Sequence, residues 1–144
     1  MGASVSAYWP GMTEEQFESQ PGFWNDDRAW ANWMAEIDKD PAVSDAIGKL
    51  RVQAILTYKT DPMENDEVEW MTPRKLRDAC LLLREAVQSG GAPETRVILE
   101  AYERNAKRIQ PVAEEFIRDL IDIIAMTTWA EEEGATKMTL EVTW

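Results

Sequence analysis

The sequence predicts a single α+β domain that is mostly helical, with a small sheet containing the N- and C-terminal strands. Short stretches near both chain ends alternate like β-strands, whereas the apolar residues between them recur mainly at helical spacing. No repeat or long linker divides the 144 residues. This length is typical of one domain with its own core, so we expect residues 1–144 to form one unit.

The first two expected elements are a strand and a short helix. Ala3–Trp9 contains β-forming residues and ends at the turn pair Pro10-Gly11, which predicts a strand. Thr13-Glu-Glu-Gln16 has the spacing of a capping box and predicts a short helix that stops by Pro21.

A second helix is expected from Asp26 or Asp27 to about Ile37, because apolar residues recur there at steps of three and four. Aromatic residues are concentrated around it: Phe23, Trp24, Trp30 and Trp33. This cluster is either a corner of the core or an anchor for a partner. The helical spacing of the last two favours packing.

Two further helix starts are marked by a capping residue directly before a proline. Asp40-Pro41 opens a helix to about Leu50, and Thr72-Pro73 opens another. Between them, Arg51–Tyr58 fits either a strand or a continuation of the helix. The polar stretch Lys59–Glu69 predicts a loop.

Helices are expected over most of the chain from Pro73 to Glu133. The first ends at Gly90-Gly91 and buries one stripe: Leu76, Ala79, Cys80, Leu83 and Val87. The second runs from about Pro93 to Ile109, with these residues inward: Val97, Ile98, Ala101 and Tyr102.

The helix after Pro111 is expected to be the most buried element. Its predicted core face is Val112, Phe116, Ile117, Leu120, Ile121, Ile124 and Met126 or Thr127. Its predicted polar face is Glu115, Arg118, Asp119 and Asp122. Thr136–Trp144 follows the cap Gly134 and alternates along its length, which predicts a strand with one buried face.

The composition excludes several kinds of catalytic site. The chain has no His, so it cannot form a Ser–His or Cys–His nucleophile pair or a His-containing metal site. Its one cysteine, Cys80, lies on an apolar stripe and is expected to be inert. The sequence contains neither a phosphate-binding GxxxxGK(S/T) loop nor a GxGxxG turn. The carboxylates of the last helix fit a solvated face better than a metal site. We expect no catalytic centre, cofactor or metal.

Charge gives the main functional signal. The net charge is −12, from 27 acidic and 15 basic side chains. Such a field repels nucleic acid and attracts basic partners, although simple solubility also accounts for it. The densest acidic stretch ends at a tryptophan, and it supplies the candidate partner-binding residues: Asp61, Glu64, Asp66, Glu67, Glu69 and Trp70.

The N-terminus has no leader-like pattern, and no stretch approaches the length of a membrane helix, so a cytoplasmic protein is expected. The start Met1–Ser6 and four later segments resemble a group of small acidic bacterial proteins; these segments are Trp70–Pro73, Leu76–Val87, Phe116–Trp129 and Gly134–Trp144. Some of that group are suspected immunity proteins for secreted toxins. The resemblance concerns the layout of elements and transfers no functional residue.

Three functional hypotheses follow from these observations. The first is an inhibitor or immunity factor that neutralises a basic partner, such as a nuclease-type toxin, by occlusion. The second is a His-free enzyme or small-ligand-binding protein that uses carboxylates. The third is a structural homo-oligomer sealed by exposed Trp residues. The sequence leaves the oligomeric state open.

Overall fold

The computed structural model describes residues 3–21, 23–25, 30–37, 39–56, 58–59, 69–104 and 111–143, and it confirms the α+β class. The helices are α1 (Glu14–Ser19), α2 (Trp30–Ile37), α3 (Pro41–Leu50), α4 (Pro73–Ser89), α5 (Pro93–Arg104) and α6 (Val112–Glu132). The strands are β1 (Ala3–Tyr8), β2 (Phe23–Asn25), β3 (Tyr58–Lys59) and β4 (Thr139–Thr143).

The terminal strands lie side by side, as the sequence predicts. Among the described residues the sheet has the order β2-β1-β4-β3. β1 pairs antiparallel with β4, with Val5 opposite Val142 and Tyr8 opposite Thr139. β2 is antiparallel to β1, and β3 is parallel to β4. Lone strands are unstable, so this pairing gives both chain ends a place in the fold.

The helix-start signals act as expected. The Thr13 side chain accepts a hydrogen bond from the Gln16 N–H at 3.1 Å, and the Gln16 side chain accepts from the Thr13 N–H at 2.9 Å. Asp40 and Thr72 likewise accept from backbone N–H groups in the first turns of α3 and α4. These short-range bonds satisfy donors that a helix leaves unpaired at its start.

The segment after α3 is neither of the two structures considered from the sequence. Arg51 takes a left-handed conformation with φ 60°, and its N–H caps the end of α3. The chain then forms a 3₁₀ helix at Gln53–Leu56 before the short strand β3. Val52 and Ile55 are both buried, and their three-residue spacing suits this tighter helix.

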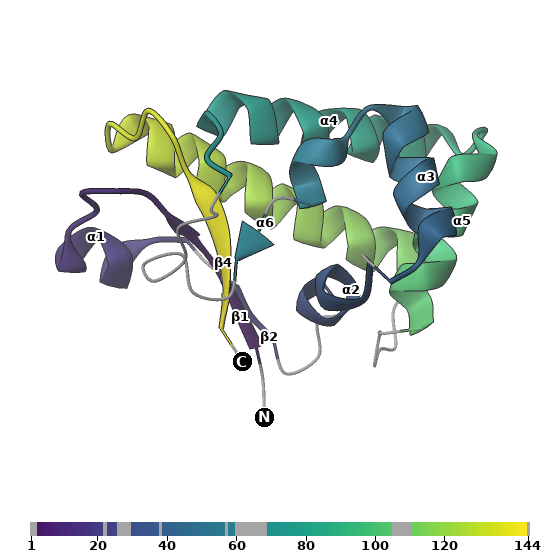
Figure 1. The fold of residues 1–144 in the computed structure, drawn as a ribbon, viewed down its shortest axis with the longest axis horizontal. Coiled ribbons are helices and arrows are strands. Elements are labelled where there is room, and N and C mark those ends of the chain that lie inside the picture. Colours follow the sequence, from purple (N-terminus) through teal and green to yellow (C-terminus); the bar gives the residue numbers. More distant parts are fainter. Residues whose placement is uncertain are drawn as a thin grey trace.

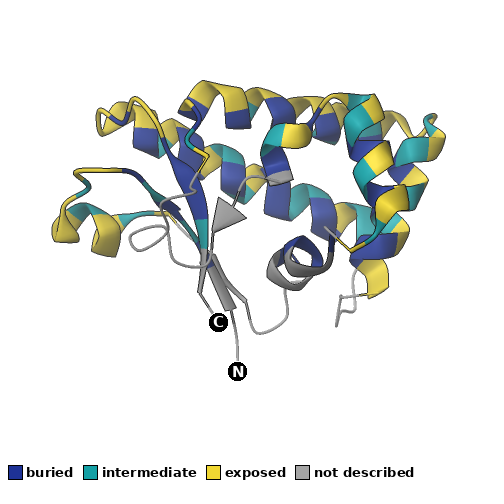
Figure 2. Ribbon diagram, in the orientation of Figure 1, coloured by how far each residue is buried: buried dark blue, intermediate teal, exposed yellow. Residues whose placement is uncertain are grey.

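α6 is the central helix of the molecule. It crosses behind the sheet in Figure 1, packs extensively against α4 and also contacts β1 and α5. α2, α3 and α5 gather at the other end, away from the sheet. In Figure 2 the buried positions lie along the inner surfaces of these helices. The predicted stripe of α4 is buried in full, including Cys80.

The orientation of α6 corrects one expectation. Glu115 and Asp119, assigned to the solvent face, are 2% and 0% exposed. Ile121, assigned to the core, is 46% exposed, and Ile124 is only partly buried, whereas Ile123 is fully buried. The buried face is thus rotated toward the carboxylates. The reason is that α5 supplies a hydrogen-bond donor to Asp119, which reduces the cost of burial.

We predict that Leu120→Ala destabilises the protein by about 2–5 kcal/mol, because a fully buried side chain is lost and a cavity remains. The matched control is Ile121→Ala on the adjacent, exposed position, where the change should be about 0.5 kcal/mol. Chemical denaturation measures both. Equal losses for the two variants would contradict the orientation of α6.

Candidate functional site

The structure describes two of the six candidate partner-binding residues. Glu69 is exposed and Trp70 is half-buried. Asp61, Glu64, Asp66 and Glu67 lie outside the described residues.

Trp70 is held by packing on both sides. Its ring centroid lies 6.0 Å from that of Tyr8, and Lys137 Nζ lies 5.6 Å from the centroid of the Trp70 ring. A cation at this distance is attracted to the electron-rich face of the indole. Trp70 is therefore anchored to β1 and to the turn before β4.

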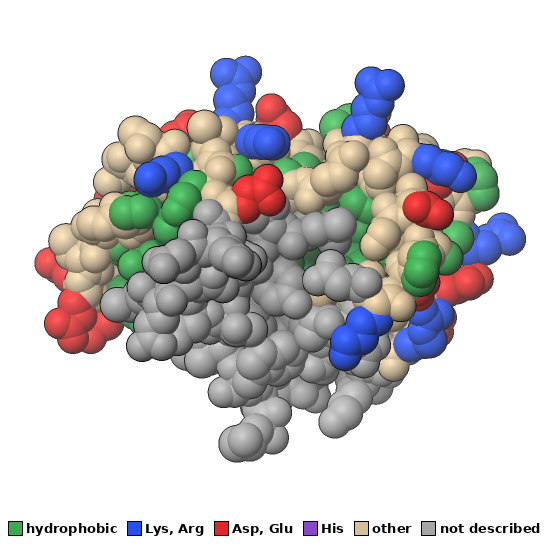
Figure 3. Space-filling model, in the orientation of Figure 1, with side chains coloured by type: hydrophobic (Ala, Val, Ile, Leu, Met, Phe, Trp, Pro, Cys, Tyr) green, Lys and Arg blue, Asp and Glu red, His purple; other side chains and the backbone are tan. Residues whose placement is uncertain are grey.

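The surface beside Trp70 carries both signs of charge. A hollow of about 500 Å³ there is lined by acidic and basic side chains, namely Arg51, Glu69, Lys75 and Asp78, and by apolar groups that include Leu82. Figure 3 shows basic side chains projecting along the upper edge, where α4 lies. The described part of this region is thus mixed in charge.

α1 is the most clearly acidic element among the described residues. Glu14, Glu15 and Glu18 are all exposed, and no residue of α1 is buried. Phe17 is 45% exposed in the middle of the helix. Figure 3 shows red side chains at this end of the molecule, on the left. α1 therefore presents an apolar ring among carboxylates without contributing to the core.

Phe17 is not among the residues predicted to bind a partner, although it is the one apolar residue in the polar helix Glu14–Ser19. A lone aromatic side chain in such a helix has no core stripe to join. α1 is held to the sheet by Gln20, whose Oε1 accepts a hydrogen bond from the Ala7 N–H at 2.7 Å. The helix is thus fixed in place while its surface remains free for contact.

The end of α6 adds carboxylates on the same side of the molecule. Trp129 of α6 packs on Trp9, just before α1, with ring centroids 5.3 Å apart. Glu132 and Glu133 are exposed. Glu131 forms an ion pair with Arg77 of α4 at 3.1 Å, which offsets its unfavourable place at a helix C-terminus.

A second group of polar residues is buried between α5 and α6. The Tyr102 hydroxyl donates a hydrogen bond to Asp119 Oδ2 at 2.5 Å. Glu115, one turn earlier, lies 3.9 Å from the Arg118 guanidinium. Burial, followed by the nearby Asp119 carboxylate, raises the pKa of Tyr102 above its ordinary value. The hydroxyl therefore stays protonated and serves as the donor to Asp119.

The Tyr102 ring belongs to a cluster of four aromatic side chains that pack against one another. Trp30, Trp33, Tyr102 and Phe116 are fully or almost fully buried. Trp30 and Trp33 have centroids 4.9 Å apart, and Tyr102 and Phe116 have centroids 5.0 Å apart in an edge-to-face arrangement. Trp30 and Trp33 are thus core residues, whereas the side chains of Phe23 and Trp24 lie outside the described part.

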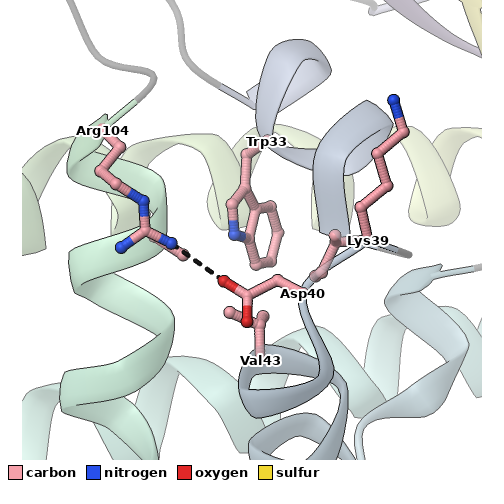
Figure 4. Close-up of a pocket in the computed structure, with 7 residues that line it drawn as sticks. Trp33, Lys39, Asp40, Val43 and Arg104 are labelled. Atoms are coloured by element: carbon pink, nitrogen blue, oxygen red, sulfur yellow. Dashed lines mark hydrogen bonds and ion pairs between the residues drawn. The ribbon is translucent and has the colours of Figure 1, made fainter.

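A cavity of about 310 Å³ lies on the outer side of this cluster, between α2, α3 and α5 (Figure 4). Trp33 forms part of its wall, and an ion pair between Asp40 and Arg104 stands beside it. The Trp33 ring therefore belongs both to the core and to this cavity.

Cys80 does not belong to either region. It is fully buried on α4, and burial raises the pKa of its thiol to about 12. A thiol held in this form is a poor nucleophile.

Within the described ranges, no three His, Cys, Asp or Glu side chains are grouped as a metal ion would require. Within the same ranges, no helix is long and apolar enough to span a membrane. Comparison of the chain with protein-family models, curated proteins and solved structures gives no match.

We predict that Tyr102→Phe lowers the free energy of unfolding by about 1–3 kcal/mol, because it removes the donor to a buried carboxylate. Tyr8→Phe is the control, since no described residue hydrogen-bonds to the half-buried Tyr8 hydroxyl. The pKa of Tyr102 is raised above 10.0, so unfolding releases its proton above about that pH.

Wild-type stability should accordingly fall more steeply above about pH 10 than that of Tyr102→Phe. Urea denaturation as a function of pH measures both effects. Equal stability losses for Tyr102→Phe and Tyr8→Phe, or parallel alkaline slopes for wild type and Tyr102→Phe, would contradict the assigned hydrogen bond.

Proposed function

We propose that this protein binds a basic protein partner and blocks it by covering its working surface, in the manner of an inhibitor or immunity protein. The observation that carries the proposal is α1, a helix that buries none of its own residues and exposes an aromatic ring among three carboxylates. A folded element that adds nothing to the core is well suited to serve as a contact surface.

The arrangement of α1 supports this role. Glu14, Phe17 and Glu18 are three and four residues apart, so they share one face of the helix. An aromatic side chain that loses water on binding supplies anchoring energy, and acidic groups around it speed association with a basic surface. The face therefore combines an anchor with a charged rim.

The overall charge favours the same class of partner. At −12, the protein attracts basic surfaces and repels nucleic acid. A partner that handles nucleic acid, such as a nuclease-type toxin, has a basic cleft in which carboxylates can take the place of phosphates. Occlusion of this kind needs no cofactor and no covalent step. The acidic stretch of the sequence that ends at Glu69 supplies further carboxylates for contact with a basic partner.

The test is capture of the partner on immobilised protein, followed by kinetics with the purified partner. Wild type should retain a basic protein whose activity it inhibits at a one-to-one ratio. Phe17→Ala should speed dissociation, and the pair Glu14→Lys with Glu18→Lys should slow association. Association of wild type should also slow as salt rises, because exposed charges are screened beyond about 8 Å at physiological ionic strength.

The control variant carries Glu85→Lys and Glu100→Lys, which change the net charge equally but lie on the exposed surfaces of α4 and α5. It should bind at close to the wild-type rate. The proposal is wrong if the natural partner is acidic. It is also wrong if both double variants lose association equally, or if the purified chain proves to catalyse a turnover reaction.

A further inference from the structure

The cavity between α2, α3 and α5 has the features of a small-molecule site. Its volume of about 310 Å³ lies at the small end of the range for ligand pockets. Its lining is divided about equally between apolar and polar surface, with four apolar residues, Trp33, Ile37, Val43 and Ala101, and three charged ones, Lys39, Asp40 and Arg104. It would hold a compound of about one ring.

The apolar wall is rigid. Trp33, Ile37 and Val43 are each at least 98% buried, so their positions are fixed by the core behind them. Trp33 in particular contacts the rings of Tyr102 and Phe116, with centroids 6.2 Å and 5.4 Å away. A preformed apolar wall favours a rigid and flat ligand, since little ordering is needed on binding.

The rim presents an oriented cation. Asp40 Oδ1 accepts a hydrogen bond from the Ala42 N–H, and Asp40 Oδ2 accepts one from Arg104 Nη2 at 3.0 Å. Asp40 thus caps α3 and also positions the guanidinium. An arginine has five N–H donors, and no other described residue accepts a hydrogen bond from Arg104. Its remaining donors are available to an anion.

Lys39 makes the rim more positive. It is exposed and forms no ion pair with any described residue, and Figure 4 shows its side chain extending away from the Asp40–Arg104 pair. Arg104 is balanced by Asp40, so Lys39 leaves one uncompensated positive charge among the residues that line the cavity. The charge at the rim therefore favours an anionic group on the ligand.

A buried donor points to the same ligand. The indole Nε1 of Trp33 is fully buried and has no hydrogen-bond partner among the described residues. In Figure 4 this edge of the ring is turned toward the Asp40–Arg104 pair. A buried N–H without an acceptor is costly, so such groups are rare. A ligand oxygen at the rim would supply the missing acceptor.

We propose that this cavity binds a small organic carboxylate with a flat apolar body. The carboxylate accepts hydrogen bonds from Arg104 and from Trp33 Nε1, and the ring lies against the apolar wall. The site is separate from α1 and stands independently of the partner-binding proposal.

The test uses benzoate as the probe, with benzamide as its neutral analogue and benzylamine as its cationic analogue. Binding to the ¹⁵N-labelled full chain is followed by the indole N–H signals in two-dimensional NMR, with the Trp33 signal assigned from Trp33→Phe. Benzoate should shift the Trp33 indole signal at millimolar concentration and should raise the melting temperature. Benzamide should bind about tenfold more weakly, because it lacks the charge that pairs with Arg104.

Two arginine variants distinguish specific recognition of benzoate by Arg104 from general electrostatic attraction of an anion to the protein. Arg104→Gln should weaken benzoate binding by about tenfold, because the charge-assisted hydrogen bonds are lost at an exposed position whose change leaves the fold intact. Arg96→Gln on the same helix, outside the cavity, is the control and should bind as wild type does. The proposal is overturned if benzoate leaves the Trp33 signal unmoved, if benzamide or benzylamine binds as well as benzoate, or if the two arginine variants behave alike.

Discussion

The buried hydrogen bond between Tyr102 and Asp119 is the constraint that sets how α2, α5 and α6 meet. It joins α5 to α6 in a region without access to water, and the donated hydrogen bond lowers the cost of burying the Asp119 carboxylate. Phe116 lies one turn from Asp119 on α6 and packs against the Tyr102 ring. Trp30 and Trp33 bring α2 to the same place, so three helices meet at one polar and aromatic centre.

The rotation of α6 follows from this centre. With Glu115 and Asp119 turned inward, Leu120 and Ile123 face the core and Ile121 is left at the surface. The same packing fixes Trp33 with one side against Phe116 and another at the cavity. The proposed carboxylate site therefore depends on the same packing of Trp33 that completes the core. α1 lies outside this core, which leaves its carboxylates and Phe17 free to contact another molecule.

The elements that the sequence predicts correctly are those fixed by neighbouring residues. The capping signals at Thr13, Asp40 and Thr72 act within a few residues, so their helices begin where expected. The α4 stripe is also predictable because it is wholly apolar.

The features that the sequence does not predict depend on residues far apart in the chain or on an unusual backbone conformation. Asp119 is buried where Tyr102, 17 residues earlier, donates a hydrogen bond to it, and spacing within one helix carries no sign of that partner. The turn at Arg51 depends on a left-handed conformation that sequence patterns seldom reveal in a non-glycine residue. The cavity is assembled from three helices, so no local pattern in the sequence predicts it, whereas Phe17 stands out in the sequence as a lone apolar residue.

The most direct test of the central claim is native-state hydrogen exchange resolved by residue. If the Tyr102–Asp119 centre couples the helices, amides around Ala101 and Phe116 should exchange only through global unfolding, with the same opening free energy as denaturation gives. Amides of α1 should exchange through local opening, with a much smaller free energy. Local exchange in α5 while α6 stays protected would contradict the claim, and so would global protection of α1.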